Sequence, residues 1–385
     1  MRTFALFCGG MADRPSEALS GRTPLEVAKT PWIDSLVKKG RVGSVNFVPR
    51  SLSASRDVAC MAMLGYDPQE YYTGLAPLEA LALDIFQDDR DVAFRFDFIT
   101  VSDDTFVDVT RRISSRESEI LVNELNSKFG DSHARFFKGR SHEGILMFKD
   151  SSFTEDLDEL ECVPPANASG QKMTKILPRG KNASVLKELM SKAKKILDDN
   201  EINRVRIDLK ENPANMIWPW GQGKKPKLPS FEGRYGARGV VVSEADFVVG
   251  LALNCGLAIS PKISEAIERE TAFIFSYTPA HPERSDLMAK IRRIEEFDAQ
   301  VVAPVCRAAE KSGAYRILIG TDLIEPIGQD LPAVGDVPFL IQGEGVEPEP
   351  CERFSEKAAQ QKRFAFDEGH KLMAYFLGKN GNGDS

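Results

Sequence analysis

Short apolar runs alternate with amphipathic stretches along most of this chain. Residues 3–8 and 315–320 are apolar and end in small residues, which is typical of buried strands in a parallel sheet. The same pattern recurs at Gly239–Ser243, Ala272–Ser276 and Val337–Ile341. Amphipathic stretches with helical spacing lie between these runs, at Thr30–Lys39, Ser184–Leu197 and Ser285–Ala309. The alternation predicts an α/β core with a mostly parallel sheet flanked by helices.

The pattern changes between about residues 90 and 182. Val92–Ile99 and Thr105–Val109 predict a hairpin, because the polar residues 102–104 between them favour a turn. A helix is expected over Glu117–Lys128, followed by a second hairpin across Ala134–Lys138 and Gly144–Phe148. We therefore predict a small α+β domain at 90–182, inserted into a core domain formed by residues 1–89 and 183–385.

Composition and charge narrow the class of protein. The net charge of −7 over 385 residues argues against a general nucleic-acid surface or an anionic-membrane surface. No apolar run approaches the roughly 20 residues that a membrane span needs. The apolar stretch at the start of the sequence, residues 1–8, is too short for a secretory signal. The six cysteines are scattered without a CxxC pair, which favours reduced thiols. We expect a cytoplasmic protein that binds neither nucleic acid nor membrane.

Several motifs carry a family resemblance. They lie at Gly21–Glu26, Leu64–Pro68, Tyr71–Gly74, Pro77–Leu81 and Ala214–Gly223. In this order the chain resembles the archaeal-type cofactor-independent phosphoglycerate mutases and the related proposed homoserine kinases of the alkaline phosphatase superfamily. The resemblance implies an alkaline-phosphatase-like core and an inserted domain that closes over the substrate. It also implies phosphoryl transfer through a serine beside two divalent metals.

The position that the resemblance gives to the nucleophile holds the wrong residue type. The family serine directly precedes an aspartate, and here Arg56 precedes Asp57. Arginine stays protonated and does not attack phosphorus. Ser55 lies one residue away, and a shift of one residue at a helix start turns the side chain by about 100°. Arg56 therefore stands at the nucleophile position, with Ser55 and Asp57 as the remaining catalytic candidates.

The positions implied for metal ligands are also mostly substituted. Gly9 stands in place of the first carboxylate, and Leu323 stands in place of a histidine. Asp322 is the surviving ligand, and His281 in the loop at 276–286 is a further candidate. One carboxylate does not hold a pair of metals. We expect no cofactor, or two divalent metals (Mn, Co or Zn) if the site is rearranged and active.

Basic residues persist where a substrate would lie. Arg95, Arg206 and Lys224, together with Arg56 and Asp57, are candidates for binding a small anionic or phosphorylated ligand. Each of the basic residues can equally form a structural salt bridge. Arg56 is of particular interest, because it places a fixed positive charge where the metals would lie. We expect it to pair with Asp322 or Asp57, or to hold a small anion.

Three functions are compatible with these residues. The first is a non-catalytic phosphoglycerate mutase-like protein that binds a small anion, a protein partner or a second copy of itself. The second is an active mutase or related metal-dependent phosphotransferase with a rearranged site, for which Ser55 is the candidate nucleophile. The third is a metal-free catalyst built on Asp57, Asp322 and His281. The fold by itself does not decide among them.

Overall fold

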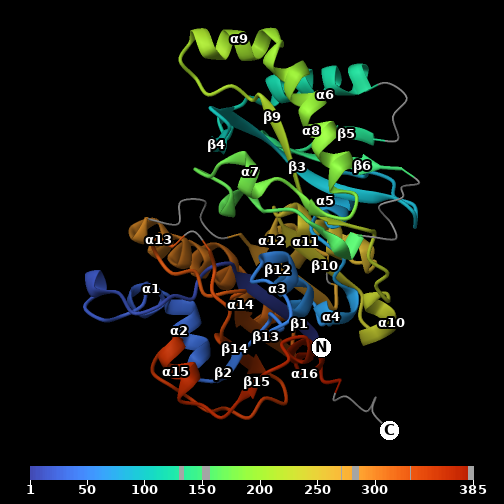
Figure 1. The fold of residues 1–385 in the computed structure, drawn as a ribbon. Coiled ribbons are helices and arrows are strands. Elements are labelled where there is room, and N and C mark those ends of the chain that lie inside the picture. Colours follow the sequence, from blue (N-terminus) through green and yellow to red (C-terminus); the bar gives the residue numbers. More distant parts are fainter. Residues whose placement is uncertain (130–133, 150–156, 270, 280–285, 330, 380–385) are drawn as a thin grey trace. The chain divides into compact units, whose positions relative to one another are not determined.

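The chain forms two compact units. In the computed structural model the described residues are 1–129, 134–149, 157–269, 271–279, 286–329 and 331–379. Unit 1 comprises Met1–Tyr72 and Lys227–Ser385, and unit 2 comprises Thr73–Pro226 (Figure 1). No helix in the described ranges combines the length and the apolar character that crossing a bilayer requires.

Unit 1 is built on one sheet that, among the described residues, has eight strands. In spatial order they are β11 (Ala258–Ile259), β10 (Gly239–Ser243), β12 (Phe273–Thr278), β1 (Arg2–Cys8), β13 (Tyr315–Gly320), β14 (Val337–Gly343), β2 (Arg41–Val45) and β15 (Ala365–Phe366). Only β14 runs antiparallel to its neighbours in this set. The predicted fold class is therefore confirmed: a mostly parallel sheet flanked by helices.

The helices of unit 1 follow the strands along the chain. They are η1 (Glu17–Leu19), α1 (Pro24–Val27), α2 (Pro31–Val37), α3 (Arg56–Met63), α4 (Pro68–Tyr71), α10 (Phe231–Tyr235), α11 (Asp246–Asn254), α12 (Ile263–Glu268), α13 (Leu287–Phe297), α14 (Ala303–Lys311), α15 (Glu356–Gln360) and α16 (Lys371–Phe376). The predicted helix at 285–309 contains a π-helical turn, η5 (Asp298–Val302), between α13 and α14. The Asp298 carboxylate there accepts a 2.8 Å hydrogen bond from the backbone N–H of Ile33 in the first turn of α2. Helical periodicity alone does not reveal such a turn.

The strand β1 lies in the core of unit 1 and packs against helices that follow it along the chain. Phe4, Leu6 and Cys8 are buried on one face and pack in a single cluster with Ile294 of α13 and Val305 of α14. Because β1, β12 and β13 are parallel, their carboxyl ends meet at one edge of the sheet, where ligands bind in open α/β folds. The antiparallel β14 begins at the same edge.

Unit 2 is an antiparallel sheet with helices on it. Its strands are β3 (Val92–Ser102), β4 (Thr105–Val109), β5 (Ala134–Lys138), β6 (Glu143–Phe148) and β9 (Met216–Gly223), with a separate pair β7 (Leu160–Glu161) and β8 (Arg179–Gly180). Its helices are α5 (Ala76–Ala82), α6 (Ser115–Phe129), η3 (Leu157–Glu159), η4 (Pro165–Asn167), α7 (Met173–Ile176), α8 (Ala183–Asp198) and α9 (Glu201–Asp208). The β3–β4 and β5–β6 pairings confirm both predicted hairpins.

Side-chain alternation along β3 separates two faces of the unit 2 sheet. Phe94, Phe96 and Phe98 pack with Leu121 of α6 and Leu186 of α8. Since successive side chains of a strand point to opposite faces, Arg95 and Asp97 belong to the other face. That face is partly covered by α5, whose Ala76 and Ala80 pack with Ala93 of β3 and Ile145 of β6.

Unit 2 extends beyond the insertion that the sequence placed at 90–182. It runs from Thr73 to Pro226, because β9 pairs with β3 and α8 packs on β9. On the other side α5 packs on β3. The hydrophobic pattern marks where strands are, but it does not show which distant strands pair. The segments flanking 90–182 were for that reason assigned to the core.

Gly65, two residues after the end of α3, tests the packing of this segment of unit 1 against Tyr235 of α10. Its φ is +88°, and a Cβ there would lie 2.0 Å from the hydroxyl oxygen of Tyr235, which donates a 2.9 Å hydrogen bond to the Gly65 carbonyl. We expect Gly65→Ala to lower the free energy of unfolding by about 2–5 kcal/mol, since left-handed strain and overpacking add. Gly256→Ala, at φ +77° with nothing within 4 Å of the new Cβ, should cost only about 1–2 kcal/mol. Urea unfolding measures both, and equal losses would contradict the assigned contact.

Candidate functional site

Arg56 is the first residue of α3 and meets two carboxylates. Ser55 before it is extended, with φ −142° and ψ 150°, so the helix begins at the arginine. The Arg56 Nη2 forms an ion pair with Glu325 Oε1, and its Nε lies 3.8 Å from Asp322 Oδ2. The expected approach of Arg56 to Asp322 is therefore present. We call Arg56, Asp322, Glu325 and Tyr277 the arginine cluster.

Asp322 is held by hydrogen-bond donors from three segments at the carboxyl edge of the sheet. Its Oδ1 accepts 2.7 Å bonds from the backbone N–H of Gly10, after β1, and from that of Leu323, after β13. Its Oδ2 accepts a 2.7 Å bond from the hydroxyl of Tyr277 in β12. The carboxylate is 1 % exposed. A buried carboxylate needs such donors, because desolvation is costly when its oxygens stay unpaired.

Glu325 is positioned by its own backbone. Its N–H donates a 3.0 Å bond to the carbonyl of Ala12, and its carbonyl accepts a 2.7 Å bond from Lys290 Nζ. The same ammonium donates to Asp13 Oδ2 at 2.6 Å, and this second ion pair is buried. The segment after β13 is thereby tied to the segment after β1 and to α13. This arrangement brings the Glu325 carboxylate to Arg56.

The ionisation states in the arginine cluster follow from burial and charge. Burial alone would lower the pKa of Arg56, but the carboxylates of Glu325 and Asp322 outweigh it and raise that pKa. Burial, and then the charge of Asp322, raise the pKa of Tyr277 well above its ordinary value. Arg56 is therefore a permanent cation, and Tyr277 remains a neutral donor to Asp322. Neither group has the proton chemistry of a general base near pH 7.

The described residues around Asp322 do not fit a pair of divalent metals. A di-metal centre needs several carboxylate or imidazole groups with lone pairs directed at the ions. Here the Asp322 carboxylate accepts from two backbone N–H groups and a tyrosine, and its nearest charged neighbour is the cation Arg56. His281 lies outside the described residues. We derive no catalytic step through metals at this position.

Asp57 and Ser55, the two other catalytic candidates from the sequence, have surroundings that differ from those of Arg56. Asp57 is buried and its Oδ2 accepts a hydrogen bond from the hydroxyl of Tyr72, so it does not pair with Arg56. Ser55 occupies the N-cap of α3, and its side chain makes no capping hydrogen bond. Ser55 thus adjoins the arginine cluster without taking part in the hydrogen bonds that hold it together.

The remaining predicted ligand-binding residues belong to unit 2. Arg206 is buried and pairs with Glu117 at 3.0 Å and Glu211 at 3.2 Å, so it stabilises the local fold of unit 2. Lys224 follows β9, and its carbonyl accepts a 2.6 Å bond from the Thr73 hydroxyl. These contacts of Arg206 and Lys224 lie within unit 2.

Arg95 belongs to a second cluster of charged side chains on β3 and β6. Its Nη1 donates to Glu79 Oε1 at 2.7 Å, and its Nη2 pairs with Glu143 Oε1 and lies 3.7 Å from Asp97 Oδ1. Burial alone would lower the pKa of Arg95, but the three carboxylates raise it. Three carboxylates already surround the guanidinium, and their negative charge disfavours the expected binding of an anionic ligand by Arg95.

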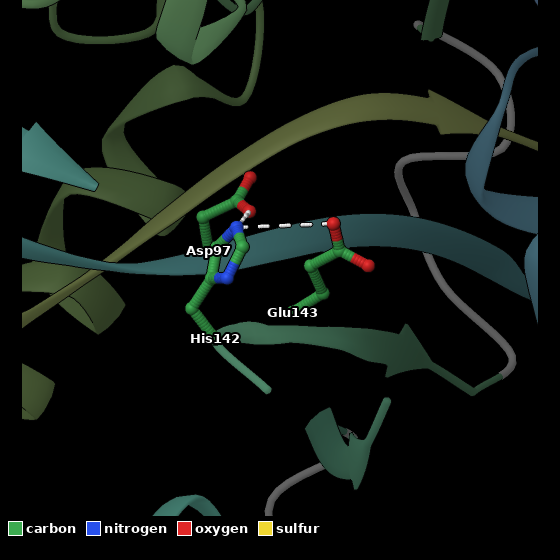
Figure 2. Close-up of side chains that lie close together, drawn as sticks. All are labelled: Asp97, His142 and Glu143. Atoms are coloured by element: carbon green, nitrogen blue, oxygen red, sulfur yellow. Dashed lines mark ion pairs between the residues drawn. The ribbon is translucent and has the colours of Figure 1, made fainter. Parts of the chain in front are cut away.

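His142 completes this second cluster. Figure 2 shows its ring between Asp97 and Glu143, with Nε2 3.4 Å from Asp97 Oδ1 and 3.8 Å from Glu143 Oε1. Burial lowers the pKa of His142, although the two carboxylates act in the opposite direction. Asp97, His142 and Glu143 form the one group among the described residues whose ligand atoms lie close enough together to hold a metal ion. The expectation that no metal is bound anywhere in the chain thus has no support here.

Sequence reasoning missed Glu325, Tyr277 and the Asp97–His142–Glu143 group. Glu325 carries one signal in the sequence, since it lies three residues after Asp322 in the segment that follows an apolar strand. Asp97 and Arg95 also carry one, because they alternate with phenylalanines in β3 and so share a face. Tyr277 gives no signal of its own, because a tyrosine at a strand end is most often a packing residue.

The sequence of this chain is similar to known proteins of one family. The sequence model of the 2,3-bisphosphoglycerate-independent phosphoglycerate mutase family matches residues 37–203. A protein of that name from Methanothrix thermoacetophila is 35% identical, over 98% of this chain and 100% of the relative. A probable 2,3-bisphosphoglycerate-independent phosphoglycerate mutase from Geobacter sulfurreducens is 31% identical, over 98% of this chain and 100% of the relative.

Solved structures show the same fold. A protein from Pyrococcus horikoshii superposes with a TM-score of 0.82 at 23% identity, covering 100% of this chain and 99% of the other. A cofactor-independent phosphoglycerate mutase from Thermoplasma acidophilum superposes with a TM-score of 0.63 at 23% identity, covering 99% of this chain and 100% of the other. At this level of identity the likeness concerns the fold.

The Arg56–Glu325 pair should be coupled energetically. Arg56→Ala leaves two carboxylates without their cation, so we expect it to lower the free energy of unfolding by about 2–4 kcal/mol. A double-mutant cycle with Glu325→Ala should give a coupling of about 1–3 kcal/mol by urea unfolding. The exposed pair Arg238–Glu232, 2.8 Å apart, is the matched control and should couple by less than about 1 kcal/mol. A coupling no larger at Arg56–Glu325 than in the control would show that this partly buried pair is not formed.

Proposed function

This chain belongs to the 2,3-bisphosphoglycerate-independent phosphoglycerate mutase family, and from that membership we propose that it keeps the family fold without the family's phosphoryl transfer. The single observation that carries the proposal is the pairing of Arg56 with Glu325 and Asp322. At the position that the resemblance gives to the nucleophile, the chain has a permanent cation engaged by two carboxylates. Such a group does not attack phosphorus, and its positive charge repels a cationic metal beside it.

The substitutions in the core are physically consistent with one another. Carboxylates grouped without a metal repel one another and are costly to bury. A chain that gives up its metals should therefore lose most of the ligands and acquire a protein cation for those that remain. Arg56 meets that requirement for Asp322, and Gly9 and Leu323 stand where further ligands were expected. This consistency favours the loss of the whole metal centre over the exchange of one ligand in a centre that still binds metal.

The charges also bear on what the core binds. Arg56 supplies one positive charge against the two negative charges of Asp322 and Glu325, so a phosphate dianion would enter negative surroundings. Of the ligands considered from the sequence, a protein partner or a second copy of the chain is favoured over a phosphorylated metabolite. We propose a binding role in the cytoplasm. The six cysteines support that location, since all are free thiols.

An active mutase is the second candidate, and two observations favour it. Relatives that align with 98% of this chain at 31% and 35% identity are named as a probable mutase and a mutase, and the Ser55 side chain makes no capping hydrogen bond next to Arg56. In that case Ser55 would have to act as the nucleophile, and its activation would require a base or a metal. Asp57 is the carboxylate nearest to Ser55 in sequence and so the first candidate for that base, but its Oδ2 already accepts a hydrogen bond from the hydroxyl of Tyr72.

An activity assay separates the two candidates. We expect purified protein with Mn²⁺ or Co²⁺ to convert 3-phosphoglycerate to 2-phosphoglycerate no faster than buffer, while the Methanothrix relative under the same conditions provides the positive control. Urea unfolding of the same sample verifies that the chain is folded. Metal-dependent turnover that disappears in Ser55→Ala or Asp322→Asn would overturn the proposal and establish a rearranged mutase site.

A further inference from the structure

The second charged cluster begins with a like-charge pair across two strands. In the β3–β6 ladder Asp97 is directly opposite Glu143, and both side chains lie on the face that does not contact α6 and α8. Like charges in directly opposed positions destabilise an antiparallel pair. Asp97 is 3% exposed and Glu143 is 29% exposed at the side chain, so water screens the repulsion only in part. Such a pair calls for a cation between its members.

Arg95 supplies only part of the required positive charge. It faces three carboxylates, because Glu79 takes Nη1 while Asp97 and Glu143 share Nη2. One guanidinium is thus shared among three carboxylates in a largely buried group. The Trp220 indole N–H donates to Asp97 Oδ2, which adds a hydrogen bond but no charge. Asp97 and Glu143 share a single nitrogen of that guanidinium, so a further cation between them would be stabilised.

His142 directs a nitrogen at the same two carboxylates without bonding to either. The ring makes no hydrogen bond to any described residue, and Nδ1 is buried without a partner. Its Nε2 faces Asp97 Oδ1 at 3.4 Å and Glu143 Oε1 at 3.8 Å, and the three atoms lie within 4.8 Å of one another. Four ligands around a metal at about 2.1 Å stand about 3.4 Å apart. The two distances from Nε2, 3.4 Å and 3.8 Å, are close to that value, and the third separation is within 4.8 Å.

We propose that Asp97, His142 and Glu143 form a divalent-metal site in unit 2, separate from the arginine cluster of unit 1. The ligand set of one imidazole nitrogen and two carboxylate oxygens suits Zn²⁺ or Co²⁺ better than Ca²⁺ or a thiolate-selected metal. A divalent ion would relieve the repulsion between the opposed carboxylates of Asp97 and Glu143. Three protein ligands leave a coordination position open to water or to a small ligand, as in sites where zinc acts as a Lewis acid.

Arg95 sets the affinity of this site. Its Nη2 contacts the same two oxygens that would bind the ion, so the guanidinium and the metal repel each other. Arg95 keeps Glu79 as its own partner at 2.7 Å, which lets it remain folded against Trp220 when the metal binds. Removal of the guanidinium should therefore strengthen metal binding, whereas removal of a ligand should weaken it. A merely structural salt-bridge cluster would not respond in these two directions.

Zn²⁺ titration of the full chain by calorimetry, with metal content measured after desalting, tests the site. We expect about one Zn²⁺ per chain, and affinity at least about tenfold weaker in His142→Ala and Glu143→Gln. Arg95→Met, which keeps an apolar stem against Trp220, should bind at least about tenfold more tightly. The absorption of bound Co²⁺ in the visible range should report nitrogen and oxygen ligands, and it should be lost in His142→Ala.

Matched controls separate this site from others in the chain. His370→Ala removes another half-buried histidine beside a carboxylate, since His370 Nδ1 lies 3.9 Å from Asp67 Oδ1. Glu211→Gln removes a paired carboxylate elsewhere in unit 2. Both should leave Zn²⁺ affinity unchanged, and so should Asp322→Asn in the arginine cluster. The proposal is overturned if the wild type does not bind Zn²⁺ saturably, or if affinity falls with Asp322→Asn and not with His142→Ala.

Discussion

The buried carboxylate of Asp322 is the constraint on which the rest of the core depends. A charged oxygen pair at 1 % exposure needs a donor for each lone pair that has lost water. The donors come from the ends of β1, β12 and β13, which meet because these strands are parallel and in register. Arg56 then adds the positive charge from the start of α3. The carboxylate thus ties three strands and one helix to a single point at the edge of the sheet.

Both units place an arginine among carboxylates, but with different balances of charge. In unit 1 Arg56 faces Asp322 and Glu325, and the backbone and Tyr277 supply the remaining donors. In unit 2 Arg95 faces three carboxylates, and a histidine beside them makes no hydrogen bond to a described residue. In the first cluster the carboxylates already have donors and a cation, while in the second one guanidinium is shared among three carboxylates. The same residue type is therefore a dedicated partner in one unit and, under the proposal above, a competitor of a metal ion in the other.

Much of the fold could be predicted from local pattern. The strands at 239–243, 315–320, 105–109 and 134–138 have the bounds that the apolar runs indicated, because side-chain alternation and turn residues are local signals. The extent of unit 2 and the π-helical turn at Asp298–Val302 were not predicted, because each depends on a partner far away in sequence. β9 pairs with β3 across most of unit 2, and no property of either strand alone names the other.

The sequence by itself determined the family and the fold class, and it predicts Arg56 at the position that the resemblance gives to the nucleophile, since each of these depends on residue identity and order. Only the tertiary structure decided the partners of that arginine, because Glu325 and Tyr277 reach the cluster through strand register and loop path. It also decided that His142, Asp97 and Glu143 converge, because Asp97 and Glu143 become neighbours only when β3 and β6 pair. Residue types specify which chemistry is available, and the strand pairing determines which of those groups come close enough to act together.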